Sequence, residues 1–232
     1  MNAILPIRLN VMLKVFLLPA SDGAGAVLID AGMPGQAGRI LEELAKHGFK
    51  PDMLRLILIT HGHTDHFGSA RDLRARTGAP VAVHAADSVA LRRGVNPPEW
   101  NTPAAGLLKA LAGLLPSRTS TNEAIALEPD IVFEEEWRLD AYGVAAQVLH
   151  TPGHTPGSIT VHFDTGEMIV GDLVRGHLLQ PRRPAPPFVA LDLDQNWQSL
   201  ARLMALGPRE IHVSHWGPLK PADAERLMAQ TQ

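Results

Sequence analysis

The chain has 232 residues, of which 45% are hydrophobic and 19% charged, a balance typical of a globular protein rather than a disordered one. The formal net charge of −3 gives no general attraction to nucleic acid. The sequence contains no stretch of about 20 apolar residues, so it does not predict a membrane span. Cysteine is absent, so disulfides, zinc–thiolate sites and thiol nucleophiles are excluded. The sequence has no charged start followed by an unbroken apolar run, so it does not predict a secretory signal. We expect a cytoplasmic protein without nucleic-acid or membrane partners.

The predicted elements alternate between strands and helices. Two apolar runs within 2–30 flank the turn sequence ASDGAG and predict a hairpin. Apolar periodicity then predicts helices, and short β-branched or leucine runs predict strands. In chain order we expect helix 36–47, strand 54–60, helix 69–77, strand 81–84, helix 86–93, strands 131–133, 145–150, 158–163 and 167–171, helix 196–206 and strand 211–214. This order predicts two sheets with helices on their outer faces.

The segment 94–128 departs from this pattern. Thr102 and Pro103 resemble an N-cap and a first helical position, and leucines then occur almost all round 104–115. We expect one domain over 1–232 with a helical insertion at 94–128. The insertion could cover an apolar pocket as a lid, or it could be a core contact or the contact of a homodimer.

Ligand-type side chains follow four of the apolar runs. The run LRLILIT leads into the sequence HGHTDHFG, and three later runs each end shortly before one more histidine or aspartate. The candidate metal ligands are His61, His63, Asp65, His66, His154, Asp172 and His215. Because the ends of buried strands are rigid, we expect these side chains to converge at one site.

The chemistry of this set is specific. Five imidazoles and two carboxylates without a thiolate suit zinc, with iron or manganese as alternatives. Seven ligands are too many for one tetrahedral ion, but they fit two ions if one carboxylate is shared. Such a pair lowers the pKa of a bridging water and stabilises a developing oxyanion, which predicts hydrolysis.

The motifs HGHTDH, TPGHTPGS, GD and the late SH resemble, in order and spacing, the metallo-β-lactamase-fold hydrolases. The resemblance implies an α+β fold, a four-layer αββα sandwich of two mixed sheets with helices on the outer faces. It implies that His61, His63 and His154 hold one metal, that Asp65, His66 and His215 hold the second, and that Asp172 bridges them. A bridging hydroxide would then be the nucleophile, with Asp65 and Asp172 as the catalytic carboxylates and Asp65 guiding the proton. Asp30 would orient the motif by hydrogen bonds.

Departures from known subfamilies leave the substrate open. Metallo-β-lactamases of the best-known type carry cysteine at the position of Asp172, and glyoxalase II enzymes add a helical domain after the last histidine. Lactonases of this fold usually place a tyrosine shortly after the bridging aspartate, where this chain has Arg175 and His177 as candidate substrate contacts. We expect a small ester, lactone or thioester as substrate. The alternatives are an iron-dependent sulfur (persulfide) dioxygenase with one metal ion, and a non-catalytic metal-binding module.

Overall fold

The computed structural model describes residues 3–102 and 121–231 of the chain. Its first sheet has six strands in the order β1-β2-β3-β4-β5-β6. They are β1 (Leu5–Arg8), β2 (Lys14–Pro19), β3 (Ala26–Ile29), β4 (Leu54–Leu58), β5 (Val81–His84) and β6 (Ile131–Phe133). The first three strands pair antiparallel, whereas β3, β4, β5 and β6 run parallel. The sheet is therefore mixed.

The second sheet is also mixed and has the order β13-β10-β9-β8-β7. Its strands are β7 (Trp137–Arg138), β8 (Ala146–His150), β9 (Ile159–Phe163), β10 (Glu167–Ile169) and β13 (Glu210–His212). Neighbours pair antiparallel except β10 and β13, which are parallel. A small hairpin of β11 (Arg175–Gly176) and β12 (Pro184–Ala185) lies outside both sheets.

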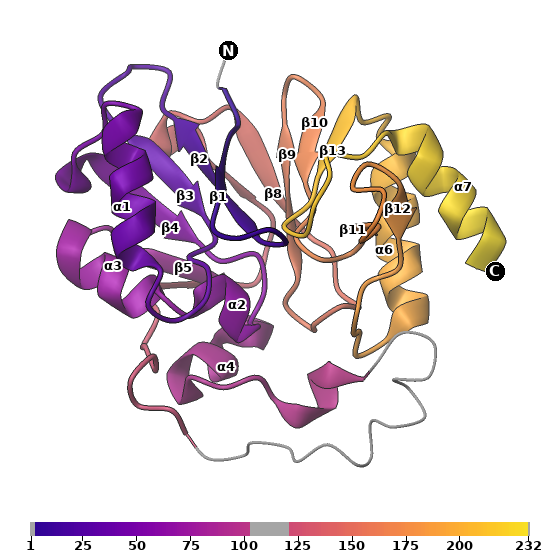
Figure 1. Ribbon diagram of the computed structural model, residues 1–232, viewed down its shortest axis with the longest axis horizontal. Coiled ribbons are helices and arrows are strands. Elements are labelled where there is room, and N and C mark those ends of the chain that lie inside the picture. The colour runs from indigo at the N-terminus through magenta and orange to yellow at the C-terminus, as the bar shows by residue number, and fades with distance from the viewer. Residues whose placement is uncertain (1–2, 103–120, 232) are drawn as a thin grey trace.

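Three apolar clusters hold four layers together, with helices on both sides of the two sheets (Figure 1). The helices are α1 (Ala37–Lys46), α2 (Thr64–Phe67), α3 (Ala70–Thr77), α4 (Ser88–Arg93), α6 (Leu193–Ala205) and α7 (Pro221–Thr231). One cluster fills the space between the sheets, and side chains such as Leu56 and Val161 meet there. The other two lie beneath α1 and α3 and beneath α6 and α7. The fold is the αββα sandwich expected from the resemblance.

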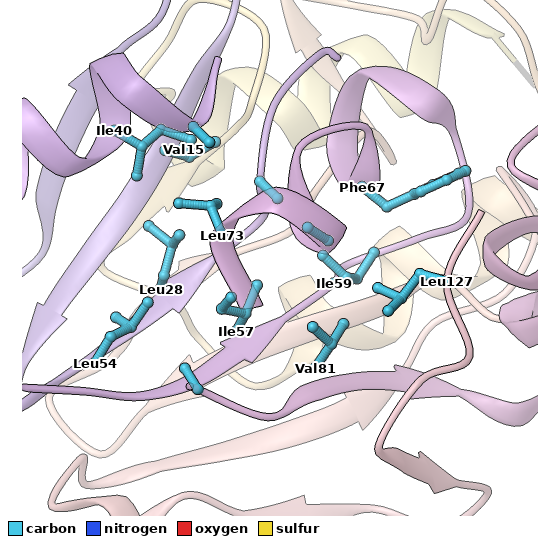
Figure 2. Packing of buried hydrophobic residues seen from close by; sticks show 14 of the residues in the cluster. Val15, Leu28, Ile40, Leu54, Ile57, Ile59, Phe67, Leu73, Val81 and Leu127 are labelled. Carbon is cyan, nitrogen blue, oxygen red and sulfur yellow. The ribbon is translucent and has the colours of Figure 1, made fainter. Parts of the chain in front are cut away.

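The packing beneath α1 and α3 is apolar and continuous. Ile40 of α1 and Leu73 of α3 lie over Leu28, Ile57 and Val81 of the first sheet (Figure 2). All five side chains have no exposed surface. Burial of each such side chain stabilises the fold by about 1.5–3 kcal/mol, so this layer holds the sheet rigidly behind the loops that follow its strands.

The structure adds elements to those predicted from the sequence. The predicted hairpin within 2–30 is a three-stranded meander, because Asn10 accepts hydrogen bonds from the backbone N–H groups of Met12 and Leu13 (both 2.8 Å) and turns the chain before β2. Helices α2 and α7 were not predicted, since α2 is a single turn and α7 buries only Ala224 and Met228. The leucine-rich part of the insertion at 94–128 lies outside the described residues, so the lid stays a prediction. Among the described residues, no helix combines the length and apolar character needed to cross a bilayer.

Candidate metal centre

The candidate ligands follow strands that point the same way. In the parallel part of the first sheet, Asp30 follows β3 and His61 follows β4. In the second sheet β8, β10 and β13 are mutually parallel, and they lead to His154, Asp172 and His215. Carboxyl ends of parallel strands meet at one edge, so the strand directions bring side chains more than 180 residues apart in the sequence to one place.

The first group of donors consists of His61, His63 and His154, all buried. His154 Nε2 lies 3.0 Å from His63 Nδ1 and 3.2 Å from His61 Nε2. The other ring nitrogen of His154, Nδ1, lies 2.8 Å from the carbonyl oxygen of Val189 and donates to it. Its Nε2 therefore carries a lone pair directed at the other two imidazoles.

The second group consists of Asp65, His66 and His215. His215 Nε2 lies 3.4 Å from Asp65 Oδ2, and His66 Nε2 lies 3.6 Å from the same oxygen. Asp172 Oδ2 lies 3.1 Å from His215 Nε2, 3.6 Å from His66 Nε2 and 4.0 Å from His154 Nε2. One carboxylate oxygen of Asp172 thus lies within reach of both groups.

Asp30 orients two of the imidazoles from outside the cluster. Its Oδ1 accepts the backbone N–H of Thr60 (2.8 Å), and its Oδ2 accepts His66 Nδ1–H (2.8 Å). The Thr60 hydroxyl donates to Asp30 (2.9 Å) and so accepts from His61 Nδ1–H (3.0 Å). These bonds leave Nε2 of both His61 and His66 free to face the centre. Asp30 itself has a φ of 66°, a strained conformation that the surrounding bonds maintain.

The first group is neutral at physiological pH in the metal-free protein. Burial, together with the neighbouring His66 and His154, lowers the pKa of His61 well below its usual value. Burial and His154 lower the pKa of His63 to about 3, and burial also lowers the pKa of His154. Three neutral imidazoles whose ring nitrogens converge form a set that a divalent cation would stabilise, because each can offer it a lone pair.

The second group is charged. Burial disfavours protonated His66, but the carboxylates of Asp65, Asp172 and Asp30 outweigh it and raise the pKa of His66 well above its usual value. Against burial, Asp172 and Asp65 likewise raise the pKa of His215 to about 9. Burial would raise the pKa of Asp172, yet His215 and His66 bring it well below its usual range. Two imidazolium ions thus neutralise two carboxylates here.

The donor set fits divalent metal ions. Nitrogen and oxygen donors without thiolate suit zinc, iron or manganese. His66 Nε2 and Asp172 Oδ1 are fully buried and have no hydrogen-bond partner among the described residues. Buried polar atoms normally have partners, so these two atoms mark a place prepared for a ligand.

The sequence analysis did not identify Asp87, which links the two loops of the first group. Its carboxylate accepts the backbone N–H groups of Gly62 (2.7 Å) and Gly157 (2.6 Å) and the hydroxyl of Thr155 (2.6 Å). Burial raises the pKa of Asp87 to about 6, although these three donors oppose the shift. A Cβ at position 157 would lie 2.7 Å from the Asp87 carboxylate, so only glycine permits this approach. Asp87 could have been found in the sequence by the same criterion as the ligands, because it comes shortly after the apolar run of a strand, β5.

The two predicted substrate contacts differ in position. The guanidinium of Arg175 lies over the ring of Phe188, 4.0 Å from its centroid, and that ring contacts His215. His177 Nδ1 accepts the backbone N–H of Leu179 within the β11–β12 hairpin. Among the described residues, no hydrogen bond or ring contact joins His177 to the metal-ligand cluster. Arg175 therefore borders the centre, whereas His177 organises its own hairpin.

Comparison with known proteins agrees with this geometry. Residues 15–215 match the family model of the metallo-beta-lactamase superfamily. The chain is 29% identical over 220 residues to the probable metallo-hydrolase YflN of Bacillus subtilis, covering 88% of this chain and 80% of that protein. It is 31% identical over 178 residues to a hydroxyacylglutathione hydrolase of Cereibacter sphaeroides, covering 75% of this chain but only 51% of that protein.

Among solved structures, TTHA1623 in a di-iron-bound form superposes with a TM-score of 0.64 at 25% identity, covering 95% of this chain and 96% of that one. The family match extends over most of the chain and includes every candidate ligand. The chain belongs to the metallo-beta-lactamase superfamily.

Proposed function

We propose that the chain is a dinuclear metal-dependent hydrolase. His61, His63 and His154 would hold one ion, and Asp65, His66 and His215 the other. The observation that carries the proposal is the position of Asp172, whose Oδ2 lies 3.1 Å from His215 Nε2 and 4.0 Å from His154 Nε2. A carboxylate that reaches both groups is what two ions sharing a ligand require.

The residues of the chain have separate tasks in this proposal. When bound, two divalent ions supply Lewis acidity that polarises a carbonyl and lowers the pKa of water. Asp30 keeps His66 in the tautomer that faces the centre. Asp65 is 34% exposed, whereas Asp172 is 12% exposed, so Asp65 is the carboxylate that can exchange a proton with solvent. Its pKa lies below the usual range, because His66 and His215 outweigh the effect of burial, and the ionised form can accept that proton.

The proposed substrate is a small ester, lactone or thioester. The superfamily match and the metallo-hydrolase name of the B. subtilis relative support hydrolysis. The hydroxyacylglutathione hydrolase, whose name denotes thioester cleavage, supports a thioester within that class. The di-iron form of TTHA1623 supports two metal sites and makes iron an alternative to zinc.

The proposal is tested by loading the metal-free protein with zinc, iron or manganese and assaying a panel of lactones, thioesters and phosphodiesters. We expect about two ions per chain by elemental analysis, and hydrolysis of a lactone, oxoester or thioester. One iron per chain with oxygen consumption on glutathione persulfide would instead show the dioxygenase. Metal binding with no turnover of any compound would favour a non-catalytic module.

Metal binding should release protons from one group only. His215 has a pKa of about 9 and is protonated at pH 7, so the second ion must displace its proton. The affinity of the second group should therefore rise up to tenfold per pH unit for each proton released, until the pH exceeds the pKa of His215. The first group, with His63 at a pKa of about 3, should show little change above pH 6.

Titration calorimetry in buffers of different ionisation enthalpy counts these protons for each equivalent of zinc. We expect close to no protons to be released when one equivalent of zinc binds, and one or two protons when the other equivalent binds. Equal release by both equivalents would show that the charge difference between the groups is wrong.

A further inference from the structure

A surface cavity of about 610 Å³ lies outside the metal centre, between the β11–β12 hairpin and α7. Helix α7 packs against β12, and these two elements form the walls of the cavity (Figure 1). None of the seven candidate metal ligands belongs to its lining. Ligand pockets in proteins usually measure about 300–1,000 Å³, so the cavity has room for a small organic molecule.

The cavity carries an excess of positive charge. Arg182 and Arg183 come from the hairpin and Arg226 from α7, while Asp223 is the one carboxylate of the lining. Asp223 pairs with Arg226, whereas neither hairpin arginine makes a side-chain hydrogen bond or ion pair with another described residue. Three guanidinium groups against one carboxylate leave a charge of +2, in a chain whose formal net charge is −3. This local charge attracts an anion.

Backbone hydrogen bonds hold the hairpin in one shape. The N–H of His177 donates to the carbonyl of Arg183 (2.7 Å), and the N–H of Arg183 donates to the carbonyl of Gln180 (2.8 Å). The N–H of Gly217 donates to the carbonyl of Pro181 (2.9 Å) and joins the hairpin to the loop after β13. The two neighbouring arginines therefore extend from a fixed backbone, which reduces the entropic cost of bringing both guanidinium groups to one anion.

We propose that this cavity binds the phosphate group of a soluble organic phosphate of about nucleotide size. A terminal phosphate carries a charge of about −1.5 to −2 near pH 7, which matches the excess in the cavity, and planar guanidinium groups bind two of its oxygens at once. Gln180 and Gln230 offer amide groups to the rest of the ligand, while Pro184 and Leu227 provide apolar surface. The site is separate from the proposed hydrolysis.

An anionic lipid surface is the competing source of phosphate. Leu178 and Leu179 lie on the same hairpin and are 63% and 82% exposed, and exposed apolar side chains near arginines suit a membrane surface. Neither leucine lines the cavity, whereas the arginines line a hollow that a flat layer of headgroups does not fill. The shape of the site therefore favours the small molecule.

Titration calorimetry on the metal-free full chain tests the site, with ADP as the phosphate probe and adenosine as its phosphate-free partner. We expect one ADP per chain, adenosine to bind at least tenfold more weakly, and ADP to bind more weakly at high salt because exposed charges are screened. The double variant Arg182→Gln/Arg183→Gln should weaken ADP binding at least tenfold. Arg39→Gln, which removes an exposed arginine of α1, should match the wild type. Equal affinity for ADP and adenosine, or unchanged ADP binding in the double variant, would overturn the proposal.

The Asp223→Asn variant should bind ADP more tightly, an effect that misfolding does not produce. Removing the carboxylate releases Arg226 and raises the charge of the cavity by one, so we expect the affinity to increase about two- to fivefold. Weaker or unchanged ADP binding in this variant would contradict the proposed role of the arginines.

Two further measurements locate the anion. Loading the protein with zinc should change the ADP affinity less than about threefold, because no candidate metal ligand lines the cavity. Loss of ADP binding in Arg175→Gln but not in the double variant would place the anion in the metal centre and overturn the proposal. Binding to vesicles of phosphatidylcholine and phosphatidylglycerol without binding of ADP would assign the arginines to a membrane surface instead.

Discussion

The Asp172→Ala variant is expected to bind about one metal ion per chain instead of two and to lose roughly 10³-fold in kcat/KM. Asp172 Oδ2 lies within 4.0 Å of nitrogen atoms from both groups of ligands. Its removal would take one ligand from each proposed ion, and it removes the negative charge that balances His66 and His215. Elemental analysis of the reconstituted variant and its steady-state kinetics measure both effects.

The Asp194→Asn variant provides the control, because Asp194 is exposed in the first turn of α6 and contacts no candidate ligand among the described residues. It should keep two ions per chain and wild-type kinetics. Asp172→Asn keeps the shape of the side chain and separates loss of charge from loss of volume. Retention of two tightly bound ions by Asp172→Ala would refute the shared-ligand arrangement.

The Asp87→Ala variant should be less stable by about 2–5 kcal/mol and should bind metal at the first group about 10- to 100-fold more weakly. Removing the carboxylate leaves the buried N–H groups of Gly62 and Gly157 without the acceptor they now share. These residues border His61, His63 and His154, so both loops lose a constraint on their ligands. Urea unfolding of the metal-free protein and chelator competition measure the two effects.

Asp130→Ala is a matched control at the other end of β5, where Asp130 accepts the backbone N–H of Val81 (2.9 Å). It should cost no more than about 1 kcal/mol and leave metal binding unchanged, since the site is 39% exposed. A purely structural role for Asp87 would lower stability without selectively weakening one of the two metal equivalents. That result would remove Asp87 from the metal site.

Local sequence predicted most elements of the fold because the buried runs are long and regular. The residues of β4 are apolar except for Arg55, and the i, i+4 spacing of Ile40 and Leu44 marks one face of α1. The missed elements lack such a signal. Helix α2 has one turn within the ligand motif, and the turn between β1 and β2 depends on the side chain of Asn10 together with backbone hydrogen bonds to Leu13.

The sequence by itself determined the chemical type of the candidate site. It supplies histidines and aspartates at 61–66 and in the later motifs, and no cysteine, so the donors are nitrogen and oxygen atoms without thiolate. Only the tertiary structure decided which nitrogen of His66 and of His154 faces the centre, because the partners of these two rings, Asp30 and the carbonyl of Val189, come from other loops. It also decided that Arg175 borders the centre while His177 does not, although the two are only two residues apart. Hydrogen-bond direction and aromatic stacking depend on side chains brought together from distant strands, and spacing along one chain carries no information about them.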